Sequence, residues 1–320
     1  MRFVLSLLAC VFMLSAAQAG EVILYSSNNQ ESIDLVVAGF QAAHPGTSVS
    51  VVRDGTGALM KRLRAEKAAP RADVFWSGGF ATLGANQDLF APYRTPAASS
   101  MSPGMVGPDS LWLGTNVHVM VFMVNTDALG ALPAPARWAD LFDTKYKGKI
   151  AITDPAKSSS AYAQIYGVKV TFGEDGLKKL AANVVQTSST GATYEGVAKG
   201  EFPIGITMEY AAQQYVAGGQ KNIRLVYPAD GTFLSPEGMI VVKGAPHMAE
   251  ARLLYDYLAS APAQERLAAK TFRRPARLDV PLSAVGLPAM SEIKVVPTDD
   301  VKAATVLKEV IDGWAVSVGR

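Results

Sequence analysis

The chain has 320 residues, of which 49% are hydrophobic, and its 30 basic and 28 acidic side chains give a formal net charge of +2. This balance argues against binding to nucleic acid or to anionic membranes by charge alone, because such binding needs a clustered excess of Lys and Arg. The length allows one large or two medium domains, and Cys10, the single cysteine, allows no disulfide within the chain.

The first residues predict a secretory signal peptide over residues 1–19. Arg2 supplies a positive charge, an apolar stretch follows, and Ala-Gln-Ala at residues 17–19 has the small side chains of a cleavage site. The apolar stretch is too short to span a bilayer comfortably, and no later stretch is long and apolar enough. We therefore expect an exported protein whose mature chain begins at Gly20 and has lost Cys10.

Strand, turn and helix alternate three times in the first part of the chain. We expect strands at residues 21–25, 48–52 and 72–76, helix caps at Asn28 and Thr56, and a third helix opened by residues 77–79. This alternation predicts an α/β fold with a parallel sheet, in which ligands bind beyond the carboxyl ends of the strands. The candidate binding residues at these ends are Ser26, Ser27, Asn28, Gly55, Thr56, Gly57, Trp76, Ser77 and Gly78.

The second half repeats this architecture around residues 154–162 (Asp-Pro-Ala-Lys-Ser-Ser-Ser-Ala-Tyr). An expected strand at residues 149–153 precedes them and a helical pattern follows, so Ser158 is placed to cap that helix. Unpartnered N–H groups at a helix start suit a small anion, because they lie at the positive end of the helix dipole. The candidates at this and two later helix starts are Ser158, Ser159, Ser160, Tyr162, Ser189, Thr190, Glu209 and Tyr210.

Each feature also has a simpler explanation. A capped helix usually binds nothing, aromatic side chains such as Trp76 usually pack in a core, and Glu209 can be an ordinary first-turn acid favoured by the dipole. A site is favoured because several hydroxyl-bearing helix starts recur and are expected to face one another. Glu209 would then pair with an amino group of the ligand.

The sequence contains few residue patterns that are typical of enzymes. The three histidines, His44, His118 and His247, lie far apart in sequence and are expected to be surface or packed residues. No metal-ligand spacing, Gly-x-Ser-x-Gly elbow, P-loop or dinucleotide fingerprint is present in the sequence. We expect neither an enzyme, a metal nor a cofactor. The remaining chain is expected to form turns at residues 230–232 and 236–238, a basic loop at 273–277 and a last helix at 301–318.

A set of short motifs spans nearly the whole expected mature chain, at residues 24–26, 71–79, 154–162, 196–201, 204–210, 227–232 and 273–277. In this order they resemble the periplasmic solute-binding proteins of ABC importers. More closely, the chain is similar to the family 1 extracellular solute-binding proteins, in the cluster of ferric-iron, phosphonate and sugar-phosphate binders.

The resemblance implies a type II periplasmic binding protein fold, in which two α/β lobes joined by hinge strands close on a solute. We expect a first lobe at residues 20–116 plus 235–272 and a second at 125–227 plus 273–320. The hinge strands are expected at residues 117–124 and 226–235. The resemblance also implies the periplasm as the location, a membrane permease as the partner, and a monomer that binds no nucleic acid.

The expected solute is a small anion, and a phosphonate or an organophosphate is favoured. The ferric binders of this cluster use two adjacent tyrosines where this chain has Glu209 and Tyr210, so one tyrosine is missing. A hard ferric ion prefers several anionic oxygen ligands. An aminophosphonate would place its anion on hydroxyls and its amine on Glu209. Ferric-iron binding is one alternative, and an enzyme on the same two-lobe fold is another.

Overall fold

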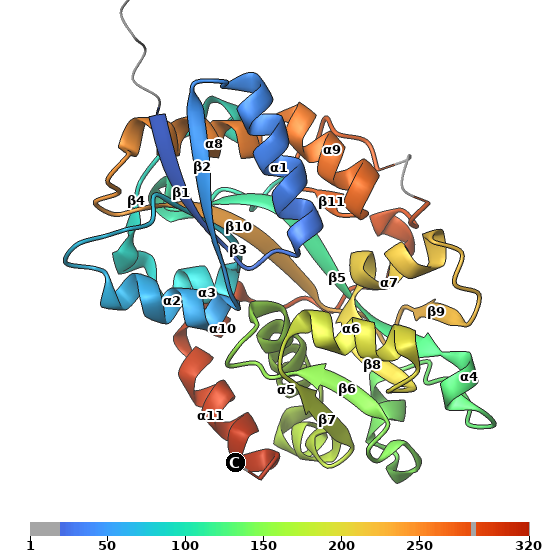
Figure 1. Ribbon diagram of the computed structural model, residues 1–320. Helices are drawn as coiled ribbons and strands as arrows, with labels where there is room; N and C mark the ends of the chain where they lie inside the picture. Colours follow the sequence, from blue (N-terminus) through green and yellow to red (C-terminus); the bar gives the residue numbers. More distant parts are fainter. Residues whose placement is uncertain (1–19, 283–285, 320) are drawn as a thin grey trace, which may run out of the picture.

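The computed structural model describes residues 20–282 and 286–319 (Figure 1). The signal peptide expected over residues 1–19 lies outside the described residues. Two sheets, each with its own hydrophobic core, make up an upper and a lower lobe in Figure 1. Among the described residues, no helix combines the length and the apolar character that a membrane span requires.

The first lobe, drawn at the top of Figure 1, carries the N-terminal strands. Its strands are β1 (Gly20–Ser26), β2 (Thr47–Arg53), β3 (Val74–Gly79), β4 (Phe90–Ala91), β10 (Leu234–Val242) and β11 (Arg274–Pro275). Its helices are α1 (Gln30–Ala43), α2 (Thr56–Ala65), α3 (Phe80–Gly84), α8 (Met248–Ala259) and α9 (Ala261–Thr271). β1 lies between β2 and β3, parallel to both, and β10 runs antiparallel beside β3. The expected strand–turn–helix alternation therefore places the carboxyl ends of β1, β2 and β3 at one edge.

The second lobe, below it in Figure 1, repeats the pattern. Its strands are β6 (Ile150–Thr153), β7 (Val184–Thr187), β8 (Ile204–Met208) and β9 (Ile223–Val226). Its helices are α4 (Thr126–Leu129), α5 (Ser159–Ala181), α6 (Thr190–Lys199) and α7 (Glu209–Ala217). β6 runs parallel to both β7 and β8. Helices α5, α6 and α7 follow β6, β7 and β8, so they begin at the carboxyl ends of these strands.

One long strand joins the two sheets. β5 (Leu113–Asn125) pairs with β10 of the first lobe up to Val119 and with β8 of the second from Met120 onward. The chain then returns between β9 and β10, whose first residue pairs with Val119. A hinge at residues 117–124 and 226–235 stays a prediction, and so do the lobe boundaries.

The C-terminal segment differs from the expectation. The expected last helix is two helices, α10 (Asp300–Thr305) and α11 (Leu307–Ser317), because Val306 leaves helical geometry between them. α10 packs against α3 and α11 against α5. At the start of residues 273–320, which the sequence assigned to the second lobe, β11 pairs with β5 in the first sheet and Ala276 belongs to the first core.

One expected helix start and one expected turn lie in strands instead. Residues 77–79 do not open a helix, because Gly78 and Gly79 pair with β10, and α3 begins only at Phe80. Residues 236–238 (Pro-Glu-Gly) lie inside β10, which pairs with β3 on one side and β5 on the other. The local signal for a turn is overridden by pairing with strands that are distant in sequence, and a register shift next to Gly238 absorbs the irregularity.

Candidate functional site

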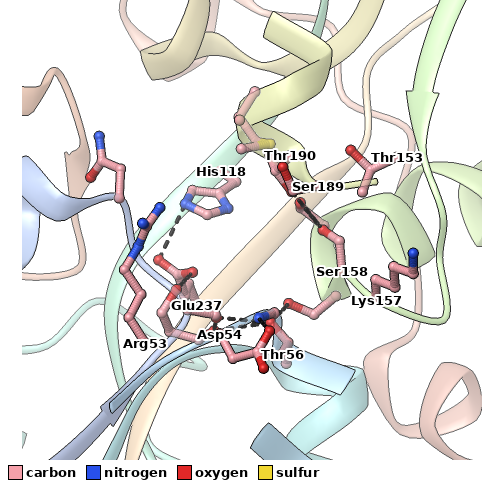
Figure 2. A pocket seen from close by; sticks show the side chains of 18 of the residues that line it. Arg53, Asp54, Thr56, His118, Thr153, Lys157, Ser158, Ser189, Thr190 and Glu237 are labelled. Atoms are coloured by element: carbon pink, nitrogen blue, oxygen red, sulfur yellow. Dashed lines mark hydrogen bonds and ion pairs between the residues drawn. The ribbon is translucent and has the colours of Figure 1, made fainter. Parts of the chain in front are cut away.

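A cavity of about 540 Å³ lies between the lobes, where helix starts from both sheets meet (Figure 2). Its predicted lining residues are Ser27, Gly55, Thr56, Ser77, Ser158, Ser159, Ser160, Ser189, Thr190 and Tyr210. Residues that sequence reasoning missed complete the lining: Asn29, Arg53, Asp54, Ala58, His118, Thr153, Lys157, Ser188, Gly191, Tyr194, Met208 and Glu237. The candidate residues of the two halves therefore face one cavity.

The N-cap residues of five helices line this cavity, two from the first lobe and three from the second. They are Asn29 of α1, Gly55 of α2, Ser158 of α5, Ser189 of α6 and Met208 of α7. Each of these helices directs the positive end of its dipole and its first N–H groups toward the cavity. This arrangement favours an anion.

The caps differ in detail from the sequence expectation. Ser158 caps α5 as predicted, and its Oγ accepts a hydrogen bond from the N–H of Ala161 at 3.3 Å. The cap of α1 is Asn29 rather than Asn28, and the cap of α2 is Gly55 rather than Thr56. Gly55 provides no capping side chain, so the hydroxyl of Thr56 is used elsewhere.

Along one side of the cavity, hydroxyl groups from separate helix starts lie within hydrogen-bonding distance of one another. Ser27 Oγ donates to the carbonyl oxygen of Ser77 at 2.6 Å and lies 2.8 Å from Thr56 Oγ1. In the second lobe, Ser158 Oγ lies 3.0 Å from Thr190 Oγ1. Ser27, Thr56, Ser158, Ser189 and Thr190 form what we call the hydroxyl wall. It offers several short O–H groups whose hydrogens can rotate toward a ligand.

The two lobes touch where the start of α2 meets the loop before α5. The N–H of Gly57 donates to the carbonyl oxygen of Lys157 at 3.3 Å. A Cβ atom added at Gly57 would lie only 2.0 Å from the carbonyl oxygen of Ala156, and one at Gly55 would lie 2.8 Å from that of Lys157. Glycine is therefore required at both positions for the backbones to approach this closely.

The charged side chains at the rim are exposed. Arg53 and Lys157 come from opposite lobes, and both appear beside the cavity in Figure 2 together with Asp54. Arg53 Nε donates to the carbonyl oxygen of Asn28 at 2.9 Å, and Asp54 Oδ1 accepts from the N–H of Gly55 at 2.7 Å. The two cations add to the positive potential of the helix starts.

The opposite side of the cavity is a connected, buried cluster, which we call the inner wall: His118, Tyr210 and Glu237, with Arg273 behind them. Glu237 Oε2 lies 3.2 Å from Arg273 Nη1 and 3.2 Å from His118 Nε2. The guanidinium of Arg273 lies over the Tyr210 ring, 4.1 Å from its centroid, and the Tyr210 and His118 ring centroids are 5.1 Å apart. None of the four is more than 8% exposed.

Glu237 is charged despite its burial. Burial alone would raise the pKa of this carboxyl, but His118, the Arg273 guanidinium and the Ser77 hydroxyl together lower the pKa to about 2. Ser77, which donates to Glu237, has φ of 93°, an uncommon conformation for a residue other than glycine. The backbone at the end of β3 is therefore held so that its side chain faces the inner wall.

Glu209 does not line the cavity, and its predicted role with a ligand amine needs correction. Its carboxylate accepts two hydrogen bonds from Arg274, both at 2.6 Å, and one from the Tyr227 hydroxyl at 2.5 Å. The side chain is only 2% exposed. Glu209 is therefore already neutralised by a cation of its own chain.

Six further predicted residues also lie outside the lining: Ser26, Asn28, Gly57, Trp76, Gly78 and Tyr162. Trp76 is fully buried and donates to Thr115 Oγ1 at 3.2 Å, and Tyr162 is buried and donates to the carbonyl oxygen of Ala303. These two aromatic residues therefore pack in the cores, which was the simpler of the two explanations given for them. Ser26 Oγ accepts from the side chain of buried Asn28 at 3.3 Å, so both support the turn from behind.

Comparison with known proteins identifies the family. Residues 68–304, more than half of the chain, match the sequence model of the bacterial extracellular solute-binding protein family. The chain therefore belongs to this family. A Salmonella paratyphi A protein, provisionally named as 2-aminoethylphosphonate-binding and periplasmic, is 28% identical over 84% of this chain and 77% of its own. Iron uptake protein A1 of Synechocystis sp. is 27% identical over 82% of this chain and 78% of its own.

A solved structure is similar in fold. The periplasmic binding protein AfuA from Actinobacillus pleuropneumoniae, with fructose-6-phosphate bound, has a TM-score of 0.84 and 25% identity, covering 93% of this chain and 98% of that chain. These findings confirm the resemblance and the α/β type II fold with two lobes. The family and these relatives are binding proteins for transport, so the expectation that the chain is not an enzyme is also confirmed.

Proposed function

We propose that this protein is the periplasmic component of an ABC importer that captures a small phosphonate or organophosphate in the cavity between its lobes. The observation that carries the proposal is that five helix starts from two lobes converge on one cavity. A phosphate or phosphonate group has three oxygens that accept hydrogen bonds, and helix N–H groups and hydroxyls can satisfy them without a buried counter-ion. The bound solute would then be delivered to a membrane permease.

Closure of the lobes would be part of the binding. The hydroxyl wall takes Ser27 and Thr56 from one lobe and Ser158 from the other, so an anion contacting both favours the state in which they meet. The contact between Gly57 and Lys157 belongs to the same state. Arg53 and Lys157, one on each lobe, would lie near the ligand's charge after closure.

Relatives of this chain carry both phospho-compounds and iron in their names, so ferric iron is the main rival. The phenols in the lining are Tyr194 and Tyr210, and burial raises the pKa of both. A raised pKa opposes the phenolate form that a ferric ion needs. The hydroxyls and helix starts favour the phospho-anion.

Thermal shift and calorimetry with inorganic phosphate, alkylphosphonates, sugar phosphates and ferric citrate test the proposal. A phospho-compound should raise the melting temperature by mass action. Ser158→Ala should weaken its binding by about tenfold or more, because a hydrogen bond to a charged group contributes about 1.5–3 kcal/mol.

Ser260→Ala is the matched control, because Ser260 caps α9 in the same way but lies outside the cavity lining. Both variants should lose similar stability, and only Ser158→Ala should lose affinity. Failure of every phospho-compound to bind, with ferric citrate giving a visible charge-transfer band that Tyr210→Phe removes, would overturn the proposal in favour of iron.

A further inference from the structure

The inner wall holds one imidazole in a fixed orientation. His118 Nε2 lies 3.2 Å from Glu237 Oε2 and 3.1 Å from Arg273 Nη1, and the ring packs beside Tyr210. Its other nitrogen, Nδ1, makes no hydrogen bond to any of the residues that the structure describes. Figure 2 shows His118 tied to Glu237 across the cavity from Ser158 and Ser189. One ring nitrogen is therefore anchored and the other is left for a ligand.

The buried acids near the cavity are poorly placed to receive a ligand ammonium. Glu237 already accepts from Ser77, faces His118 and pairs with Arg273, which is 1% exposed. A second cation in this wall would have to displace a buried guanidinium or remain unpaired, and either outcome is costly. Glu209 is committed to its own arginine. Asp54 is exposed at the rim, and its Oδ1 accepts a backbone N–H at 2.7 Å.

The cavity is larger than its anion-binding side requires. Its volume of about 540 Å³ lies within the range of about 300–1,000 Å³ that is usual for pockets that bind small molecules. A phosphate group alone would fill a small part of it. The ligand therefore has room for a carrier group that reaches from the hydroxyl wall to His118.

We propose that His118 determines specificity by hydrogen bonding through Nδ1 to a neutral hydroxyl on the carrier group of the phospho-ligand. Glu237 and Arg273 act as positioning residues for the imidazole. Nδ1 accepts when Nε2–H donates to Glu237, and it donates when Nε2 accepts from Arg273. A hydroxyl fits both tautomers because it can donate and accept, whereas an ammonium can only donate and fits one of them. The ligand class is then a hydroxyl-bearing phosphonate or organophosphate rather than an aminophosphonate.

This inference rests on the proposed function, and matched ligand pairs test it by calorimetry. The pairs differ only by a hydroxyl or an ammonium: 2-hydroxyethylphosphonate against 2-aminoethylphosphonate, and glucose 6-phosphate against glucosamine 6-phosphate. In at least one pair, the hydroxyl member should bind about tenfold tighter or more, the ratio expected when an ammonium is left without a partner. If no member and no inorganic phosphate binds, the proposed function itself fails.

Variants assign the discrimination to His118. His118→Phe should abolish the hydroxyl-over-ammonium ratio, and His118→Gln, which keeps a hydrogen-bonding group, should restore part of it. Glu237→Gln should reduce the ratio because a neutral amide anchors the imidazole more weakly than the carboxylate does. Glu209→Gln, which removes a buried carboxylate outside the cavity, should leave the ratio unchanged.

The ratio of the two affinities is the same whatever fraction of a variant is folded. Tighter binding of the ammonium member in both pairs, or a hydroxyl preference that survives His118→Phe, would overturn the inference.

Discussion

The two walls of the cavity are built in different ways. The hydroxyl wall takes its groups from separate helix starts. Its close pairs, Ser27 with Thr56 and Ser158 with Thr190, each lie within one lobe, so the loss of one pair leaves the other in place. In the inner wall each group depends on the next, because Arg273 pairs with Glu237 and Glu237 anchors His118. A ligand-binding surface assembled from independent parts should lose affinity in small steps, whereas a connected buried cluster should lose stability in one large step.

The largest expected effect is that of Arg273→Leu. Removing one partner of a buried ion pair costs about 3–5 kcal/mol, because Glu237 would remain buried and charged without its cation. Chemical denaturation measures this free energy of unfolding. Arg64→Leu is the control, since it breaks an exposed pair with Asp88 at 3.1 Å and should cost less than about 1 kcal/mol. Similar costs for the two variants would contradict a connected inner wall.

The next effect is a dependence of stability on acid. The pKa of Glu237 is lowered from 4.5 to about 2, because the effects of His118, Arg273 and Ser77 together outweigh burial. A carboxyl with a lowered pKa stabilises the fold above its unfolded value, and this stability is lost as the pH falls from 4.5 to about 2. The lost part is at most about 3 kcal/mol. Glu237→Gln should flatten the curve of unfolding free energy against pH over this window, and an unchanged slope would refute the assignment.

Gly57→Ala should reduce affinity without reducing stability. The added Cβ would lie 2.0 Å from the carbonyl oxygen of Ala156, so the lobes could not close fully. Alanine also favours a helix over glycine by about 1 kcal/mol, so the fold should not suffer. We expect binding to weaken by about tenfold in calorimetry, which corresponds to 1.4 kcal/mol. Gly313→Ala in α11, where the added atom meets open space, should keep full affinity. Equal affinity of the two variants would argue against closure at this contact.

The smallest effects should come from single hydroxyls that cap no helix. Thr190→Val removes a hydroxyl that lies 3.0 Å from Ser158 Oγ, and Ser27→Ala removes one in the other lobe. Each should weaken ligand binding by about threefold to tenfold, the value of an ordinary hydrogen bond. Because the two groups sit on separate helix starts, the double variant should show the sum of the two free energies. A much larger loss would mean that the hydroxyl wall is connected after all.

The same contrast explains what the sequence could predict. The strand–turn–helix alternation and the cap at Ser158 are local signals, so the α/β fold and most of the hydroxyl wall followed from them. Glu237 was missed because Pro-Glu-Gly is typical of a turn, and only pairing with two distant strands makes it part of β10. The start of α3 was misplaced for the same reason, because Gly78 and Gly79 pair with β10. The cap of α1 was misplaced by one residue, from Asn28 to Asn29.

The adjacent arginines show the limit most clearly. Arg273 and Arg274 were expected in a basic loop, yet both are buried, and each pairs with a glutamate far away in sequence. Glu237 faces the cavity and Glu209 does not, although both are buried acids with an arginine partner. Which of two such acids lines a site depends on long-range packing, and no local pattern carries that information.

Elemental analysis of the protein as isolated from its native cell envelope distinguishes a bound phospho-anion from bound ferric iron. Mass spectrometry can count phosphorus and iron per chain in one sample, and the polypeptide itself contains neither element. We expect one phosphorus atom per occupied chain, lost together with the bound solute after unfolding and dialysis, and little iron. One iron atom per chain without phosphorus would contradict this expectation.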